Sequence, residues 1–205
     1  QEPAPPAAER ARIRLQDLFA GELLVYASLA AIISLSNGVV NSFISLFAQE
    51  RGIPNIGLFF TVSACSMLLA RLVGGRLQDR YGLSAILYPA LAIAGASMLL
   101  LASAWTLPVV LVASAMRSIG QSTAQPALQA TCIRRLGPRR TGLATSTYFV
   151  GADVGQGLGP IIGGAISENF GYGTMYAGTG AILLAGMGIY ALYARRERHA
   201  QATVP

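Results

Sequence analysis

The chain alternates between long apolar stretches and short polar ones. Between Leu23 and Ala48, for example, no residue carries a charge, and a helix of that length spans the roughly 30 Å hydrocarbon core of a bilayer. Only 12% of the residues are charged, against about a quarter in soluble domains. This pattern predicts an all-α membrane protein with transmembrane helices at about 23–48, 56–75, 83–104, 108–131, 141–167 and 172–194.

Polar segments flank this predicted six-helix bundle, which covers residues 21–195. Residues 1–20 contain prolines that resist helix formation, so we expect a linker there, and residues 196–205 form a polar tail. The sequence opens with Gln1 rather than Met. We therefore expect a part of a longer chain, with a processed N-terminus as the alternative.

The distribution of arginine indicates the topology. The linker, the 76–82 and 134–140 loops and the C-terminal end together carry twelve arginines, whereas the opposite side carries only Arg51, next to Glu50. Basic residues mark the cytoplasmic side of a membrane protein. We therefore predict six crossings with both termini in the cytoplasm.

A nine-residue segment occurs twice. Residues 74–82 read Gly-Gly-Arg-Leu-Gln-Asp-Arg-Tyr-Gly, and residues 163–171 read Gly-Gly-Ala-Ile-Ser-Glu-Asn-Phe-Gly. Three apolar stretches separate the copies, so they are expected on opposite sides of the membrane, and the second copy has lost both arginines, as topology requires. An inverted three-plus-three repeat is typical of secondary transporters.

The usage of histidine and cysteine argues against several classes of function. The only histidine, His199, lies in the tail, so no apolar segment offers an imidazole for a metal, a haem or a serine nucleophile. Cys65 and Cys132 form no CxxC pair. The net charge of +6 comes without a basic patch interleaved with aromatic residues. We therefore expect that the protein is not an enzyme and that it binds no metal, cofactor or nucleic acid.

Residues 75–82 resemble the loop motif of the major facilitator superfamily, which reads Gly-x-Leu-x-Asp-Arg-x-Gly followed by basic residues. The match runs to Gly82, after which Leu83 and Ser84 replace the basic pair. The family carries the complete motif between its second and third helices and a weaker copy between its eighth and ninth. The resemblance therefore implies the C-terminal half, helices 7 to 12, of a twelve-helix transporter, most similar to bacterial drug/proton antiporters of the inner membrane.

The family resemblance also implies a role for this loop. Asp79 can accept hydrogen bonds at a helix N-terminus, and Arg76 and Arg80 can pair with it or with lipid phosphate. Gly75 and Gly82 permit a sharp turn. By analogy with the family, the cluster latches one conformation. The alternative is that its charges only mark the topology.

A second motif resembles the antiporter motif of drug exporters in this family. Glycines recur every fourth residue from position 151 and precede a proline that favours bending, so one smooth face is available to a neighbouring helix. The motif residues are Gly151, Gly155, Gly159, Pro160, Gly163 and Gly164.

Two charged residues lie inside predicted helices. Asp153 lies twelve residues after Thr141, roughly 18 Å along a helix and therefore near the middle of the bilayer. A buried carboxylate there could take up a proton, pair with Arg117 or a cationic substrate, or form a structural hydrogen bond. Arg117 could bind an anionic substrate or modulate a nearby acid, and Arg71 is expected to extend to the surface.

Polar residues inside the apolar stretches provide candidates for a transport pathway or for hydrogen bonds between helices. The candidates for a polar cavity are Asn37, Asn41, Gln125, Tyr148 and Gln156. We expect half of a secondary transporter that works by alternating access, as a proton-coupled exporter of amphipathic compounds. Uptake of a small metabolite and a non-transporting scaffold are the alternatives. The expected partners are the bilayer, the matching N-terminal half, a small substrate and protons.

Overall fold

The structure, a computed structural model, describes residues 23–202, without the side chains of residues 73–81 and 197–202. The predicted linker at 1–20 lies outside the described residues. In the described part every regular element is a helix: α2 (Leu24–Glu50), α3 (Gly57–Ala102), α4 (Leu107–Leu136), a short 3₁₀ helix η2 (Pro138–Arg140) and α5 (Thr141–Ala202).

One glycine interrupts each of the two longest helices. Gly82 in α3 (φ 76°, ψ 175°) and Gly171 in α5 (φ 80°, ψ 164°) have non-helical backbone angles, so each helix consists of two helical segments joined at the glycine. A positive φ is readily adopted by glycine alone. The described chain therefore runs as six helical segments in series.

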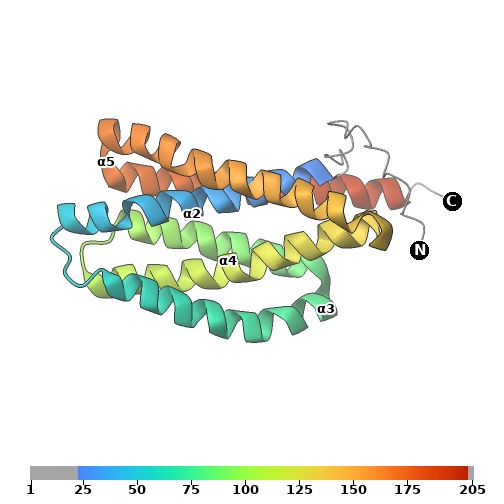
Figure 1. Cartoon of the computed structure of the whole chain (residues 1–205), viewed down its shortest axis with the longest axis horizontal. Coiled ribbons are helices and arrows are strands. Elements are labelled where there is room, and N and C mark those ends of the chain that lie inside the picture. Colours follow the sequence, from blue (N-terminus) through green and yellow to red (C-terminus); the bar gives the residue numbers. More distant parts are fainter. Residues whose placement is uncertain (1–22, 203–205) are drawn as a thin grey trace, which may run out of the picture.

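The segments run back and forth between two ends of the bundle (Figure 1). The turn at 51–56, the link between α3 and α4 and the break at Gly171 lie at one end. The break at Gly82 and the link between α4 and α5 lie at the other end, where the described chain also begins and finishes. The two copies of the repeated segment thus lie at opposite ends.

One expected loop and part of the polar tail are helical. Residues 76–81, predicted as a loop, continue α3, and the reversal is confined to Gly82. The polar tail likewise continues α5 as far as Ala202. Buried backbone groups need hydrogen-bond partners, and a helix supplies them. Because a single glycine with positive φ can reverse the chain, the helix can continue up to that glycine.

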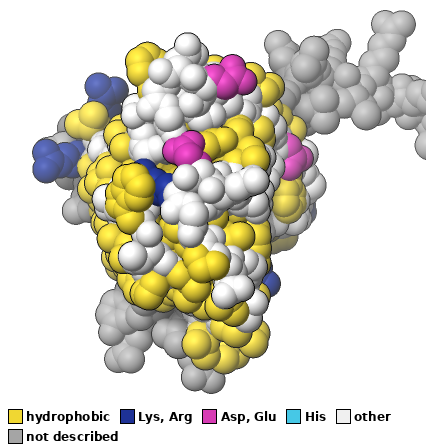
Figure 2. Space-filling view, turned by 90° about the vertical axis from the view of Figure 1, so that its left-hand side faces the viewer, with side chains coloured by type: hydrophobic (Ala, Val, Ile, Leu, Met, Phe, Trp, Pro, Cys, Tyr) yellow, Lys and Arg dark blue, Asp and Glu magenta, His cyan; other side chains and the backbone are white. Residues whose placement is uncertain are grey.

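The arginines of the described side chains are unevenly divided between the ends. Arg134, Arg135, Arg139 and Arg140 flank the α4–α5 link, and Arg195 and Arg196 lie near the C-terminus. The opposite end, seen in Figure 2, presents mostly apolar and uncharged surface with few charged side chains.

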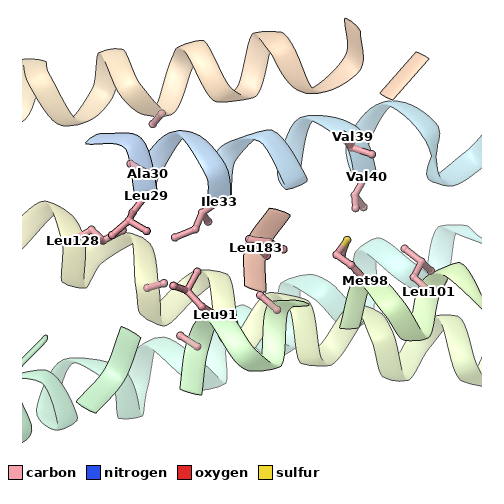
Figure 3. Packing of buried hydrophobic residues seen from close by; sticks show 14 of the residues in the cluster. Leu29, Ala30, Ile33, Val39, Val40, Leu91, Met98, Leu101, Leu128 and Leu183 are labelled. Carbon is pink, nitrogen blue, oxygen red and sulfur yellow. The ribbon is translucent and has the colours of Figure 1, made fainter. Parts of the chain in front are cut away.

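Aliphatic side chains from four helices fill the interior (Figure 3). Ile33 and Val40 of α2, Leu91 and Met98 of α3 and Leu183 of α5 are at most 2% exposed. Lipid is as apolar as these side chains, so their contribution in a membrane comes from close packing rather than from escape from water. The most extensive contacts join α2 to α5 and α3 to α4.

Glycines allow α5 to approach the backbone of α2. A Cβ added at Gly151 would collide with the carbonyl oxygen of Ala27, and one at Gly155 with that of Ala31. A Cβ at Gly159 would come within 2.5 Å of the carbonyl oxygen of Leu35. The four-residue spacing places these glycines on one helix face, so the two backbones touch where side chains would normally separate them.

Three helices in the described range are long and apolar enough to cross a membrane by length and composition: Leu24–Glu50, Gly82–Ala102 and Pro138–Arg196. A shorter apolar helix covers Gly57–Leu72. Helix α4, predicted as a span, is not among them. It carries Arg117, Gln121 and Gln125, which lower its hydropathy.

Candidate functional site

A cavity of about 340 Å³ opens among α2, α3, α4 and α5. Nine of its thirteen described lining residues carry a polar side-chain group, although the protein is more than half hydrophobic. Four of the five predicted cavity residues line it, namely Asn37, Gln125, Tyr148 and Gln156. Asn41 does not line it and is exposed elsewhere on α2. The cavity gathers residues up to 122 positions apart (34 to 156), which makes it the candidate substrate site.

Asp153 also lines this cavity, where it is the only acidic residue in the described lining. Its side chain is exposed, so the chain itself does not supply the burial expected for a mid-helix carboxylate. The helix geometry explains this exposure. Asp153 is two residues from both Gly151 and Gly155, about 200° around α5 from the face that packs on α2.

Arg71 is a cavity residue that the sequence analysis assigned to the membrane surface. It lines the cavity together with Met67, one helical turn earlier on α3. The i, i+4 spacing of the two residues was the available signal for a shared face. The cavity thus contains one basic and one acidic residue in its described lining.

Arg117 lies beside the cavity rather than in its lining. Its side chain is 5% exposed, and Nη1 donates hydrogen bonds to Asn37 Oδ1 at 3.1 Å and to Gln121 Oε1 at 2.9 Å. The guanidinium carbon is 5.8 Å from the centre of the Phe59 ring. Asn37 therefore connects Arg117 to the cavity. No ion pair between Arg117 and Asp153 occurs among the described side chains, so the expected pairing of these two is not seen.

The antiporter-like motif packs α5 against α2 next to the cavity. Gly38 of α2 is so close to α5 that an added Cβ would lie 3.0 Å from Pro160 Cδ. Gly163 and Gly164 lie near the Phe43 ring, at 3.0 Å and 3.6 Å for their added Cβ atoms. Close packing of α2 and α5 along this face brings Asn37 of α2 and Gln156 of α5 to the same cavity.

Four of the five residues of the predicted latch have side chains outside the described set. Gly75, Arg76, Asp79 and Arg80 belong to the helix segment whose side chains lie outside the described set. Gly82, the fifth latch residue, is described and forms the break in α3.

A cluster around Arg51 was missed by the sequence analysis. Arg51 donates through Nη1 to the carbonyl oxygen of Ala104 and through Nη2 to that of Ala102 at 3.0 Å. Its guanidinium lies over Phe47 and Trp105, 4.5 Å and 4.3 Å from the ring centres. Burial lowers the pKa of Arg51, an effect that Glu50 opposes, and the guanidinium stays charged. Arg51 therefore joins the end of α2 to the C-terminal end of α3 and the link that follows it.

No group of three or more histidine, cysteine, aspartate or glutamate side chains in the described range could hold a metal ion.

The Major Facilitator Superfamily model matches residues 26–205. The chain belongs to this superfamily. Together with the apolar helices, membership identifies it as an integral membrane protein. The chain is 34% identical over 117 residues to the 3-(3-hydroxy-phenyl)propionate transporter of Escherichia coli (strain K12), a match that covers 57% of this chain and 28% of the relative.

Two further comparisons cover more of this superfamily member. It is 28% identical over 192 residues to an uncharacterised MFS-type transporter of Burkholderia mallei (strain SAVP1), covering 87% of this chain and 46% of the relative. The crystal structure of the peptide transporter POT in complex with alafosfalin matches with a TM-score of 0.70 at 14% identity, over 85% of this chain and 38% of that one. The chain thus spans less than half the length of these relatives.

Proposed function

We propose that this superfamily member is the C-terminal six-helix half of a secondary transporter that moves a small molecule by alternating access. The cavity carries the proposal, because its polar side chains lie within an otherwise apolar bundle. Polar and ionisable groups inside a membrane are costly and are concentrated along substrate and ion pathways. The matching N-terminal half would supply the opposite wall.

The topology of the proposal follows from charge and repeat. Both termini lie in the cytoplasm of a bacterial cell, on the arginine-rich side, and six segments cross the inner membrane. Gly82 lies between the second and third segments and Gly171 between the fifth and sixth, so the two breaks occupy corresponding places in two successive groups of three segments. These positions support an inverted repeat. In transporters with inverted repeats, the substrate site lies near the bilayer midplane, between the repeats.

Asp153 is the proposed proton-coupling residue. Its carboxylate is the acidic group of the described cavity lining, and the second half of the transporter would enclose it. Carboxylates along a pathway inside the membrane commonly serve as proton relays, so this position suits a coupling residue. Together with the antiporter-like glycine motif, this favours proton-coupled export of amphipathic compounds.

Uptake of a small organic acid is the second candidate. The relative from Escherichia coli is a transporter of 3-(3-hydroxyphenyl)propionate, an aromatic carboxylate, and Arg71 lines the cavity of this chain. The two candidates differ in the sign of the coupled proton movement. Protons enter with the substrate during uptake and move against it during antiport.

The test is proton movement in proteoliposomes that contain the full-length transporter and an entrapped pH indicator. Ethidium and 3-(3-hydroxyphenyl)propionate serve as the two substrate probes. We expect one probe to drive proton movement that Asp153→Asn abolishes and that the matched variant Glu168→Gln retains, since Glu168 is exposed at the end of a segment of α5. Equal proton movement in both variants would exclude Asp153 as the coupling residue.

A further inference from the structure

Arg117 and Tyr176 each hold one buried polar atom without a hydrogen-bond partner in the described part of the chain. These atoms are Nε of Arg117 and the phenolic oxygen of Tyr176, on α4 and α5 respectively. The residues are 5% and 0% exposed, and they interact electrostatically with each other. Buried polar groups nearly always have a hydrogen-bond partner, so these two orphaned groups call for an explanation.

The charge of Arg117 also lacks a counterpart. Its two hydrogen-bond acceptors, Asn37 and Gln121, are neutral amides, and no acidic side chain among those described pairs with it. A buried guanidinium is costly unless an anion compensates it. An anion held by Arg117 Nε and the Tyr176 hydroxyl would satisfy both donors and the charge, and the two oxygens of a carboxylate match two donors.

The surroundings of these donors are aromatic. The Phe59 ring lies 5.8 Å from the guanidinium carbon of Arg117, and the Phe47 ring meets Tyr176 edge to face at 5.2 Å between centroids. All three rings are fully buried. Aromatic pairs favour such edge-to-face contacts, so these rings favour an aromatic group over an aliphatic one beside the carboxylate.

We infer that Arg117 and Tyr176 bind the carboxylate of an aromatic monocarboxylic acid, and that this acid is the substrate class of the transporter. The inference rests on the proposed function for the route of entry. Asn37 both lines the cavity and accepts from Arg117 Nη1, so movement of the Asn37 side chain would give an acid in the cavity access to the Arg117 guanidinium. A charged acceptor binds a guanidinium more strongly than a neutral amide does.

The test measures the thermal stability of the purified full-length transporter in chloride-free sulfate buffer, with benzoate as the probe. Benzamide has the same ring without the charge, and chloride has the charge without the ring. We expect benzoate to raise Tm and the other two to leave it unchanged. Tyr176→Phe removes only the hydroxyl and should raise the benzoate concentration for the half-maximal shift about tenfold.

Two further variants complete the design. Tyr172→Phe, one helical turn away in the same segment, is the matched control and should bind benzoate as the wild type does. Arg117→Lys keeps the charge but loses the planar set of N–H donors of the guanidinium. It should weaken benzoate binding at least as much as Tyr176→Phe. The Tm of each variant without benzoate shows that it is folded.

Two kinds of result would overturn the inference. The first is that benzoate does not raise Tm, or that benzamide or chloride raises it as much as benzoate does. The second is that Tyr176→Phe and Tyr172→Phe bind benzoate equally well. This assay measures binding alone, so it stays separate from the proposed function. Benzoate binding without proton-coupled movement would reject coupling through Asp153 and keep the carboxylate site, whereas coupled movement without benzoate binding would do the reverse.

Discussion

Gly82 and Gly171 adopt nearly the same backbone conformation at opposite ends of the bundle, with φ of 76° and 80° and ψ of 175° and 164° (Figure 1). Each is the last residue of one copy of the repeated segment. The repeat therefore encodes a chain reversal, and the reversal needs glycine at its final position because an L side chain is strained at positive φ.

Gly171→Ala should destabilise the protein by about 1–2 kcal/mol, the usual cost of left-handed geometry for a residue with a Cβ. Gly188→Ala is the matched control in α5. No atom lies within 4 Å of its added Cβ, and its φ is not positive, so the alanine should be neutral or slightly stabilising. Denaturation in detergent measures both variants. Equal stabilities would show that the break does not depend on glycine.

Gly155→Ala should separate α2 from α5, because the new methyl group would overlap the backbone of Ala31. Overpacking of this kind typically costs about 1–3 kcal/mol. Gly157→Ala places the same methyl group two residues later, where nothing lies within 4 Å. A drop in Tm confined to Gly155→Ala is the expected outcome, and a similar drop in both variants would argue against close packing of the two helices.

Arg51→Gln should loosen the end of α2 from the link between α3 and α4. The variant loses hydrogen bonds to the carbonyl groups of Ala102 and Ala104 and the contact with the Trp105 ring. Hydrogen bonds from a charged group contribute about 1.5–3 kcal/mol, so we expect a loss of that order in detergent denaturation. Arg139→Gln, in the exposed η2 turn, should have no such effect. Equal losses would point to net charge rather than to the contacts.

Ser114→Ala should have a smaller effect. The Ser114 hydroxyl donates to the Phe59 carbonyl oxygen at 2.8 Å and so connects α4 to α3. Hydrogen bonds between helices in membranes average about 0.6 kcal/mol, and a loss of that size is expected. Ser146→Ala, whose hydroxyl bonds within α5 to Leu143, is the control and should change stability less.

The sequence predicted the all-helical class, and it singled out polar residues of which several line one cavity. Asn37 and Gln156 stand out because amides are rare in apolar stretches, and both line the cavity. The superfamily itself was indicated by the motif at residues 75–82 and is established by the match over residues 26–205. Composition and motifs depend only on the local sequence, so the helical class and the superfamily can be predicted without knowledge of contacts between helices.

Side-chain direction was harder to predict. The exposure of Asp153 depends on which face of α5 packs on α2, a consequence of contacts with Ala27 and Ala31 on another helix. The position of Arg71 in the cavity depends likewise on the rotation of α3. The cluster around Arg51 joins residues more than fifty positions apart, and no local pattern signals it.

The central claim is that the cavity is the water-accessible substrate site of the transporter, and cysteine labelling tests it most directly. Exposed Cys65 and buried Cys132 are first replaced by serine and alanine. Gln156→Cys in the cavity and Leu192→Cys, exposed on α5 away from the cavity lining, are then introduced singly into the full-length transporter. A membrane-impermeant methanethiosulfonate reacts with the thiolate, which forms readily only in water. The account predicts labelling of Gln156→Cys in proteoliposomes at least about tenfold faster than of Leu192→Cys. Equally slow labelling of both would contradict it.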